Sequence, residues 1–327
     1  MELNWLITGG CGFIGINLID ALLSCSETPT RIRVLDDLSV GTREDLAKVC
    51  SFTDGLNSGG KVELVEGCIT NIDATISAAT GSDIIVHLAA NTGVGPSIQN
   101  PRQDMDFNVV GTFNMLEAAR KAKCSRFVFA SSRAPAGEVE PPIHEELAPH
   151  PVSPYGASKL AGEGYCSAYA KSFGLDTVAL RFGNVYGVHS GHKSSVVAKF
   201  IRQTLNCETL KIYGDGNQTR DFIYITDLIE AIIKASNLHG IGGEVFQIAT
   251  HKETSVSDML ETLSTAFEAM GLARPSVEFS EPLVGDVMRN YSDTTKAKQR
   301  LGWQAKVNLE EGLKKTVEYF LDQQNRH

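Results

Sequence analysis

The sequence predicts an α/β fold: a doubly wound parallel sheet followed by a smaller mixed α/β lobe. Two observations support this fold class. Short apolar runs rich in β-branched residues alternate with longer amphipathic stretches through the first half of the chain. A glycine-rich turn joins the first apolar run to the first helical stretch. Repetition of strand and helix produces a parallel sheet that helices cover on both faces.

The elements follow one another in a regular order. Strands are expected at residues 5–8, 31–35, 62–65, 83–88, 126–130 and 177–181, and amphipathic helices at 105–121 and 155–173. After about residue 184 the pattern changes to loops, isolated strands and helical stretches near 226–237, 255–270 and 310–323. We therefore expect a sheet domain at 1–183 and a smaller lobe at 184–327, with some of the later chain crossing back to the sheet.

Composition and charge argue against several classes of protein. Hydrophobic residues make up 42% and charged residues 21% of the 327 positions, as in ordinary globular chains. No apolar run approaches the roughly 18 residues of a membrane span, and the first residues lack the basic start of a secretory signal. The net charge of −9, without a Lys/Arg block, disfavours nucleic acid as a partner. We expect a cytoplasmic protein that binds neither membranes nor nucleic acid.

The cysteine and histidine pattern does not indicate a metal site or a disulfide framework. The seven cysteines are scattered and form no C-x-x-C pair. His189 and His192 come closest to a pair of metal ligands, but no acid or cysteine stands at ligand spacing near them. We therefore expect no metal.

A dinucleotide-binding turn is predicted directly after the first strand. It reads T-G-G-C-G-F-I-G at residues 8–15 and opens an apolar helical pattern. Gly9, Gly12 and Gly15 permit a tight turn, close approach of the backbone to a pyrophosphate, and close packing of helix on strand. Phe13 and Ile14 belong to the helix N-terminus, which supplies the anion site. The alternative is a glycine-rich turn without a ligand.

Two acids at the end of the second strand favour the dinucleotide. Asp36 stands 21 residues after Gly15, and Asp37 follows it. A carboxylate at this position can accept both hydroxyls of an adenine ribose and repels a 2′-phosphate. The sequence therefore predicts a Rossmann domain that binds NAD rather than NADP.

A candidate catalytic pair begins the helix at 155–173. Tyr155 and Lys159 lie four residues apart, so that both project from one face of the helix. The preceding strand ends at Ser131 and Ser132, and ligands bind at the carboxyl ends of parallel strands. The Lys159 ammonium, assisted by a cationic nicotinamide, is expected to lower the pKa of the Tyr155 phenol toward neutrality. Tyr155 would then serve as a base for a sugar hydroxyl, with Ser132 hydrogen-bonded beside it.

These residues stand within a longer resemblance that covers nearly the whole chain. The sequence resembles extended short-chain dehydrogenases/reductases of the nucleotide-sugar epimerase/dehydratase family. Besides the glycine motif, the matching segments are L-D-D-L-S (35–39), H-L-A-A (87–90), N-V-V-G-T (108–112), S-P-Y-G-A-S-K (153–159), R-F-G-N-V-Y-G (181–187), Y-G-D-G-N-Q-T-R-D-F-I-Y-I-T-D (213–227) and L-G-W (301–303).

The resemblance implies further ligand contacts. Residues near the adenine and the nicotinamide would include Cys68, Ile69, Leu88, Ala89 and Ala90. Asn184 and the segment 194–200, including Val196, would border the nucleotide sugar, and Arg220 would pair with its diphosphate. An exposed structural arginine is the alternative interpretation of Arg220.

The loop after Ser132 departs from the family pattern. Family members usually read Ser-Ser-x-x-Val-Tyr-Gly, whereas this chain continues Arg133-Ala134-Pro135-Ala136-Gly137. Related 4,6-dehydratases carry Asp-Glu, and decarboxylases carry Glu, where this chain has Arg133 and Ala134. Ala134 cannot move a proton, so both chemistries lose support. Arg133 either faces the ligand and binds a carboxylate or other acceptor, or is solvated; the sequence leaves both open.

Three more positions differ from the family pattern. Cys68 stands where an Asp usually contacts the adenine amino group, and a thiol accepts only weakly. Leu283 stands where an Arg often clamps the diphosphate, and Arg289 is the expected substitute. Asn290 replaces a bulky aromatic of some 4-epimerases, which would leave room for an N-acetyl group.

We expect an NAD-dependent 4-epimerase that acts on a UDP-hexose or a UDP-N-acetylhexosamine through a 4-keto intermediate. A nucleotide-sugar dehydrogenase or ketoreductase of the same fold is the nearest alternative, and a non-catalytic NAD-binding protein is a further one. The family often dimerises through the helices that correspond to 105–121 and 155–173. Ala157, Ala161 and Gly162 would permit close approach there, or would equally pack within the subunit.

Overall fold

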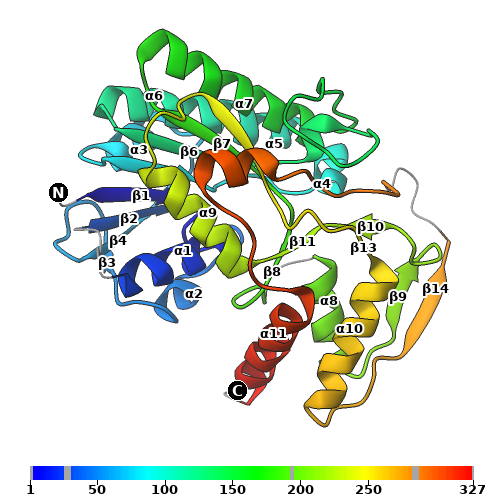
Figure 1. Cartoon of the computed structure of the whole chain (residues 1–327). Helices are drawn as coiled ribbons and strands as arrows, with labels where there is room; N and C mark the ends of the chain where they lie inside the picture. Colours follow the sequence, from blue (N-terminus) through cyan, green and yellow to red (C-terminus); the bar gives the residue numbers. More distant parts are fainter. Residues whose placement is uncertain (1–2, 26–30, 192–194, 282–286, 326–327) are drawn as a thin grey trace.

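An eight-stranded parallel sheet forms the centre of the molecule (Figure 1). The computed structural model describes residues 3–25, 31–191, 195–281 and 287–325. The strand order is β12-β7-β6-β5-β1-β2-β4-β3, and every neighbouring pair is parallel. The strands are β1 (Asn4–Thr8), β2 (Arg31–Asp36), β3 (Thr53–Asp54), β4 (Val62–Glu66), β5 (Ile84–His87), β6 (Arg126–Ser132), β7 (Thr177–Phe182) and β12 (Glu244–Ile248). The predicted fold class is confirmed.

Helices cover both faces of this sheet because successive strand residues point to opposite sides. On one face, Leu6 and Phe127 pack into a core with α3 (Ile72–Ala79), α6 (Thr112–Ala122) and α7 (Pro154–Phe173). On the other, Ile7 and Val128 belong to a core shared with α1 (Phe13–Ser24) and α9 (Ile225–Asn237), as Figure 1 shows. Shorter elements connect these layers: α2 (Arg43–Ala47), α4 (Val94–Gln99), α5 (Pro101–Met105), the π-helix η1 (Asp106–Gly111) and the 3₁₀ turn η2 (Ala134–Ala136).

Local sequence fixes the start and the end of α7. Ser153 caps the helix by accepting the Gly156 N–H at 3.1 Å, and Pro154 occupies the first turn, where its missing N–H costs nothing. Gly174 ends the helix in the left-handed region at φ +68°. Tyr155 and Lys159 consequently stand on the first turns of a well-anchored helix.

The later chain forms a smaller mixed lobe, as expected. Its strand pairs are β8 (Asn184–Tyr186) with β11 (Phe222–Tyr224), β9 (Leu210–Tyr213) with β14 (Val277–Ser280), and β10 (Thr219–Arg220) with β13 (Thr254–Ser255). Its remaining helices are α8 (Val196–Leu205), α10 (Val256–Ala269), η3 (Ala297–Leu301) and α11 (Leu309–Gln324). No helix in the described part of the chain has the length and apolarity that a membrane crossing requires.

The lobe also returns to the central sheet. β12 pairs with β7 over five residues, from Glu244 opposite Val178 to Ile248 opposite Phe182, and α9 packs against α1. The second half of the chain therefore supplies both an edge strand and a covering helix to the first. The boundary at residues 183 and 184 stays a prediction.

Candidate active site

A cavity of about 920 Å³ opens at the carboxyl ends of the central strands. Five strands of the sheet contribute a residue to its wall. Asp36, Ser132 and Phe182 end β2, β6 and β7, and Gly9 and Leu88 directly follow β1 and β5. The smaller lobe closes the other side with Asn184, Val196, Arg220 and Asn290. The cavity thus lies where the chain connections of an open α/β sheet leave a crevice for ligands.

The glycine turn forms one end of this cavity. Gly9 has φ +67°, and a Cβ there would lie 2.8 Å from the backbone nitrogen of Ala89. At Gly15 a Cβ would lie 2.5 Å from the Cα of Gly10, so the turn and the helix pack too closely for any side chain. Gly12 begins α1 without a side-chain cap, which leaves the first N–H groups of the helix available at the cavity wall. This cradle fits a dinucleotide diphosphate.

Asp36 is held at the end of β2 by two backbone donors. Its Oδ2 accepts the Cys11 N–H and its Oδ1 accepts the Leu38 N–H, both at 2.9 Å. Burial raises the pKa of this carboxyl, while the two N–H donors lower it. Each oxygen keeps a second lone pair, so the fixed carboxylate can accept ribose hydroxyls. Asp37 also lines the cavity, and its Oδ1 accepts the backbone and hydroxyl groups of Ser39.

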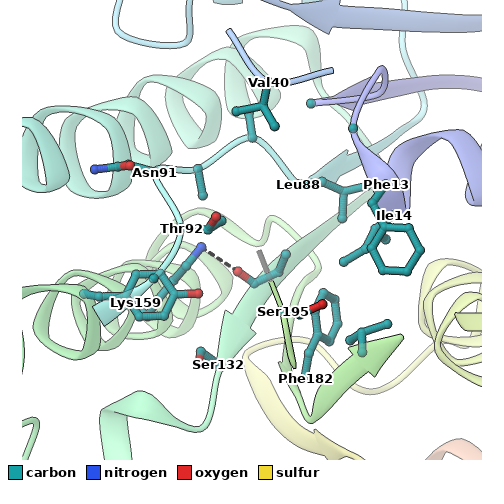
Figure 2. Close-up of a pocket in the computed structure, with 18 of the residues that line it drawn as sticks. Phe13, Ile14, Val40, Leu88, Asn91, Thr92, Ser132, Lys159, Phe182 and Ser195 are labelled. Carbon is teal, nitrogen blue, oxygen red and sulfur yellow. Dashed lines mark hydrogen bonds between the residues drawn. The ribbon is translucent and has the colours of Figure 1, made fainter. Parts of the chain in front are cut away.

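Most of the other residues expected near the cofactor line the same cavity. They are Phe13, Ile14, Ile69, Leu88, Ala89 and Ala90, of which Figure 2 labels Phe13, Ile14 and Leu88. Cys68 is not among the lining residues. Its thiol lies 3.0 Å from the hydroxyl of Thr70, whereas its neighbours Gly67 and Ile69 face the cavity.

Ser132, Tyr155 and Lys159 meet on one wall of the cavity. The buried Lys159 Nζ donates to the carbonyl of Ala130 at 2.8 Å, the dashed line in Figure 2, and lies 5.8 Å from the centre of the Tyr155 ring. The Ser132 hydroxyl acts on the Tyr155 phenol and lowers its pKa. The structure therefore brings the three predicted catalytic side chains together.

Burial is the largest influence on the pKa of each member of this pair. Burial raises the pKa of Tyr155 to about 12, although the hydrogen bond with Ser132 acts in the opposite direction. Burial also lowers the pKa of Lys159 to about 8, against the effects of Asp104 and Glu163. Removal from water outweighs the effects of the neighbouring polar and charged groups here. Lowering the Tyr155 pKa toward neutrality therefore needs the further positive charge of an oxidised nicotinamide.

Two polar clusters that the sequence did not reveal support this wall. Asn108, in the π-helix η1, donates to the carbonyl of Asn91 and to Asp104 at 2.8 Å each, and to Ser158 at 3.3 Å. It thereby connects the loop after β5 to the helix that carries Lys159. A signal was available in the N-V-V-G-T segment, but a π-helical turn cannot be read from residue spacing.

The second cluster lies behind the catalytic pair. Glu163, one further helical turn along α7 from Lys159, pairs with Arg181 of β7 at 2.7 Å and accepts the hydroxyl of Ser131 at 2.5 Å. Both charged side chains are about 95% buried. The spacing of residues 155, 159 and 163 placed Glu163 on the same helix face, but its partner on β7 could not be inferred.

The predicted substrate residues fall into two groups. Arg133, Asn184, Val196, Arg220 and Asn290 line the cavity. Arg289 does not: its guanidinium bonds to Glu253 at 2.8 and 2.9 Å and to Glu140 at 2.5 Å. Ser194, Leu283 and His192 lie outside the described residues.

The alternative of a solvated Arg133 is wrong, because only 7% of the residue is exposed. Arg133 contacts Asn184 and Asn290, a proximity that the sequence did not predict. Ser195, within the expected segment 194–200, lines the cavity, whereas Asn91, Thr92 and Phe182 were not expected there; Figure 2 labels all four. Asn91 and Thr92 follow the fifth strand and Phe182 ends β7, and this position at the carboxyl ends of strands was the signal that could have found them. Among the described residues, no cluster of three or more His, Cys, Asp or Glu side chains could hold a metal.

A Rossmann sheet, an uncapped glycine turn, a carboxylate fixed at the end of β2 and a Ser/Tyr/Lys wall together define an NAD-binding enzyme of the short-chain dehydrogenase/reductase type. The model of the NAD dependent epimerase/dehydratase family matches residues 5–249. The chain belongs to this family, and its cofactor is NAD.

Relatives and solved structures agree with this membership. A UDP-glucose 4-epimerase of Mycolicibacterium smegmatis is 37% identical over 96% of this chain and 97% of its own length. The structure of the Thermotoga maritima UDP-glucose 4-epimerase with UDP-glucose has a TM-score of 0.87, with 33% identity over 98% of this chain and 100% of that one. A UDP-glucuronic acid 4-epimerase from Bacillus cereus, solved with UDP-glucuronic acid and NAD, also has a TM-score of 0.87, with 29% identity and the same coverage.

Proposed function

We propose that this protein inverts the configuration at C4 of a UDP-linked sugar. One observation carries the proposal: Ser132, Tyr155 and Lys159 line the same cavity as the glycine turn and Asp36. A side chain that can take the proton of a sugar hydroxyl therefore lies in the same cavity as the residues that fit a dinucleotide. The 4-epimerases that resemble the chain over nearly its whole length support the assignment.

Tyr155 is the group that moves the proton. Its phenolate oxygen would take the proton of the C4 hydroxyl and later return it, and the Ser132 hydroxyl would orient that oxygen by a hydrogen bond. Lys159 is fixed by the carbonyl of Ala130 and keeps a positive charge beside the ring. Its role is to stabilise the phenolate and to keep the phenol in place.

NAD fits the cradle formed by Gly9, Gly12, Gly15 and Asp36, and when bound it supplies the reversible hydride acceptance that converts the C4 carbinol to a ketone and back. Inversion requires that the 4-keto sugar present its other face before reduction. The cavity therefore has to hold the nucleotide firmly while the sugar turns. Arg220, which lines the cavity from the smaller lobe, would hold the diphosphate, and Asn184 would border the sugar.

Nuclear magnetic resonance of the product tests the assignment directly. The protein is incubated with NAD and, separately, with UDP-hexoses, UDP-N-acetylhexosamines and UDP-uronates, and the C4 configuration is followed. We expect interconversion of one C4 pair without net formation of NADH. No change at C4 in any of these compounds would refute the proposal, and stoichiometric NADH would instead identify a dehydrogenase.

We also propose that the protein forms a homodimer through α6 and α7. Phe113, Tyr165 and Phe173 on these helices are 39%, 38% and 55% exposed, and the rings of Phe113 and Tyr165 lie 5.7 Å apart. A contiguous exposed aromatic patch of this kind is typical of an interface. Gly162 belongs to the subunit interior instead, since a Cβ there would lie 2.4 Å from the Phe129 ring.

Light scattering tests the dimer. We expect a mass of twice 35.4 kDa for the unmodified protein. A Phe113→Glu exchange should yield monomers, whereas Phe279→Glu, at a site 63% exposed on β14, should not. A monomeric mass for the unmodified protein would exclude this interface.

We further propose a cytoplasmic location. All seven cysteines are free thiols, the state that a reducing compartment maintains. Cell fractionation tests the location, and recovery of the protein outside the cytoplasm would contradict it.

A further inference from the structure

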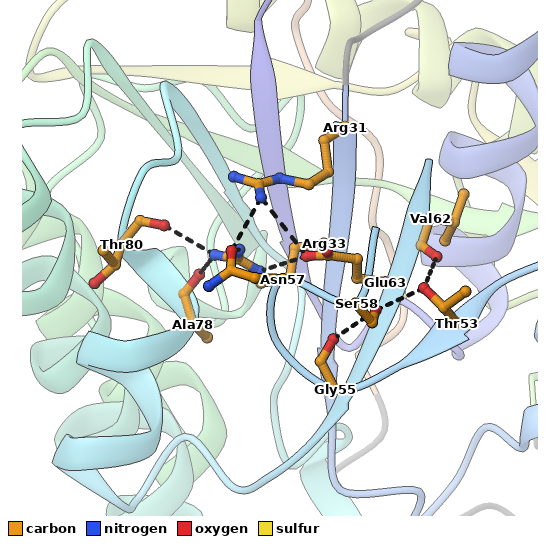
Figure 3. A network of polar contacts seen from close by, with 10 residues as sticks. All are labelled: Arg31, Arg33, Thr53, Gly55, Asn57, Ser58, Val62, Glu63, Ala78 and Thr80. Atoms are coloured by element: carbon orange, nitrogen blue, oxygen red, sulfur yellow. Dashed lines mark hydrogen bonds and ion pairs between the residues drawn. The ribbon is translucent and has the colours of Figure 1, made fainter. Parts of the chain in front are cut away.

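Four arginines are buried among the residues that the structure describes, and three of them are paired with carboxylates. Arg33 lies 3.3 Å from Glu63 (Figure 3), Arg126 lies 3.0 Å from Asp176, and Arg181 lies 2.7 Å from Glu163. This pairing is expected, because a buried charge without a counter-charge is strongly unfavourable. The fourth buried arginine, Arg133, is the exception.

Arg133 makes hydrogen bonds to uncharged acceptors. Nη1 donates to the backbone carbonyl of Asn290 at 3.0 Å, and Nη2 donates to the side-chain oxygen of Asn184. Among the residues that the structure describes, no carboxylate oxygen lies within 4.0 Å of its guanidinium. The side chain nevertheless stays charged at neutral pH, since burial lowers its pKa only to about 10.

Asp221 is the acid that acts on this charge, but its oxygens are occupied by other donors. Oδ1 accepts the backbone N–H and the hydroxyl of Thr250, at 2.7 and 2.6 Å. Oδ2 accepts the N–H groups of His251 and Ser292, at 3.1 and 3.2 Å. Asp221 therefore attracts the guanidinium from a distance without forming an ion pair, and the charge of Arg220 acts against it.

The uncompensated charge stands beside the reactive end of the cavity. Arg133 directly follows Ser132, whose hydroxyl acts on the Tyr155 phenol, and both arginine partners are cavity residues. Two buried polar atoms of residues that line the cavity, Asn290 Oδ1 and Ser195 Oγ, have no hydrogen-bond partner within the described part of the chain. A polyhydroxylated ligand that carries an anion close to its reacting carbon would satisfy all three groups.

From this arrangement we infer that Arg133 binds a carboxylate on C5 of the sugar, and that the substrate is a UDP-linked uronate. The inference rests on the proposed C4 chemistry, and it replaces the UDP-hexose or UDP-N-acetylhexosamine expected from the sequence by a different substrate class. In a pyranose, C5 is bonded to the reacting C4, so its carboxylate lies near the base that removes the C4 proton. A guanidinium matches a carboxylate by two parallel hydrogen bonds, whereas the neutral hydroxymethyl group of a hexose leaves the charge uncompensated.

The decisive experiment compares UDP-glucuronate with UDP-glucose on the unmodified protein and on Arg133→Gln. We expect the unmodified protein to favour UDP-glucuronate in kcat/KM, and Arg133→Gln to lose about 100-fold with the uronate but less than about 5-fold with the hexose. Arg133→Lys keeps the charge but cannot form the two parallel hydrogen bonds. Its kcat/KM with UDP-glucuronate should lie between those of the unmodified protein and Arg133→Gln. Arg274→Gln, at an exposed arginine on the far lobe, is the matched control and should leave both substrates unaffected.

Binding measurements separate the inference from the proposed function. Calorimetry with the NAD-loaded protein should show tighter binding of UDP-glucuronate than of UDP-glucose, and Arg133→Gln should abolish that preference. If Arg133→Gln weakened binding of both substrates equally, Arg133 would have only a structural role and the inference would be overturned. Turnover of UDP-glucose without binding of UDP-glucuronate would also overturn it, while the C4 epimerase would stand. Arg133-dependent uronate binding without any change at C4 would uphold the inference and refute the epimerase.

Discussion

Glu163 receives Arg181 at both carboxylate oxygens, with N···O distances of 2.8 and 2.7 Å, behind the wall that carries Lys159. The pair joins α7 to β7, and Glu163 also accepts the hydroxyl of Ser131 beside the catalytic serine. Its burial makes it a rigid support whose loss leaves an unpaired cation in the interior.

Glu163→Gln should therefore destabilise the protein strongly. We expect the free energy of unfolding to fall by about 3–5 kcal/mol, the cost of breaking a buried pair. Urea unfolding followed by circular dichroism measures it. Glu311→Gln, in the exposed helical pair with Lys315, is the control and should change the free energy by about 0.5 kcal/mol or less. Equal effects of the two exchanges would show that burial does not govern the Glu163 pair.

Tyr155→Phe should abolish most of the activity and leave the fold intact. Loss of a positioned base typically costs about 10²–10⁴-fold in rate. The variant should bind NAD and melt at the temperature of the unmodified protein, because only the phenol oxygen is removed. Tyr165→Phe, on an exposed part of the same helix, is the matched control. Full activity of Tyr155→Phe would require another base.

Asp36→Asn should weaken NAD binding and reduce the discrimination against NADP. The exchange removes the negative charge that accepts ribose hydroxyls and repels a 2′-phosphate. We expect NAD to bind about 10–100-fold more weakly, as for the loss of one charge-assisted hydrogen bond. Titration calorimetry with both dinucleotides measures the change. Asp322→Asn removes one negative charge at an exposed site on α11 and is the control. An equal loss of NAD affinity in this variant would contradict a specific contact between Asp36 and the ribose.

His87 should make the stability of the protein fall in mild acid. Its ring lies between the hydroxyls of Thr8, at 2.7 Å, and Thr112, at 3.1 Å, and burial lowers its pKa to about 3. The unfolded chain, with a histidine pKa near 6.5, binds the proton more readily. This contribution to stability is therefore complete above about pH 6.5 and is lost progressively as the pH falls toward 3.

The measurement is a series of urea unfolding curves between pH 7 and pH 5. Below pH 6 the free energy of unfolding should fall more steeply in the unmodified protein than in His87→Gln, in which this group cannot titrate. The difference between the two slopes should be about 1.4 kcal/mol per pH unit. Parallel pH dependence of the two proteins would show that His87 accepts a proton in the folded state.

Local sequence patterns predicted those parts of the site that are formed by residues close together in the sequence. The glycine turn, Asp36 at the end of β2, and the Tyr155 and Lys159 spacing all express rules that operate within a few residues or within one β-α-β unit. The resemblance extended these predictions to Asn184 and Arg220, which line the cavity.

Contacts between distant segments could not be predicted in this way. Arg133 is buried because Asn184 and Asn290, 51 and 157 residues further along the chain, fold over it. The pKa of Tyr155 is raised because the surrounding walls exclude water, an effect that no spacing encodes. Arg289 was expected near the substrate, but acids from two other loops, Glu140 and Glu253, bind it elsewhere.

The edge strand β12 has a consequence for how the chain is made. During synthesis the first 183 residues emerge with β7 lacking its outer neighbour, and that neighbour appears only when residues 244–248 leave the ribosome. An unpaired strand edge invites association with other chains. The nascent protein therefore passes through an interval in which most of its catalytic wall exists but its sheet is still open, and a product released at residue 183 would aggregate.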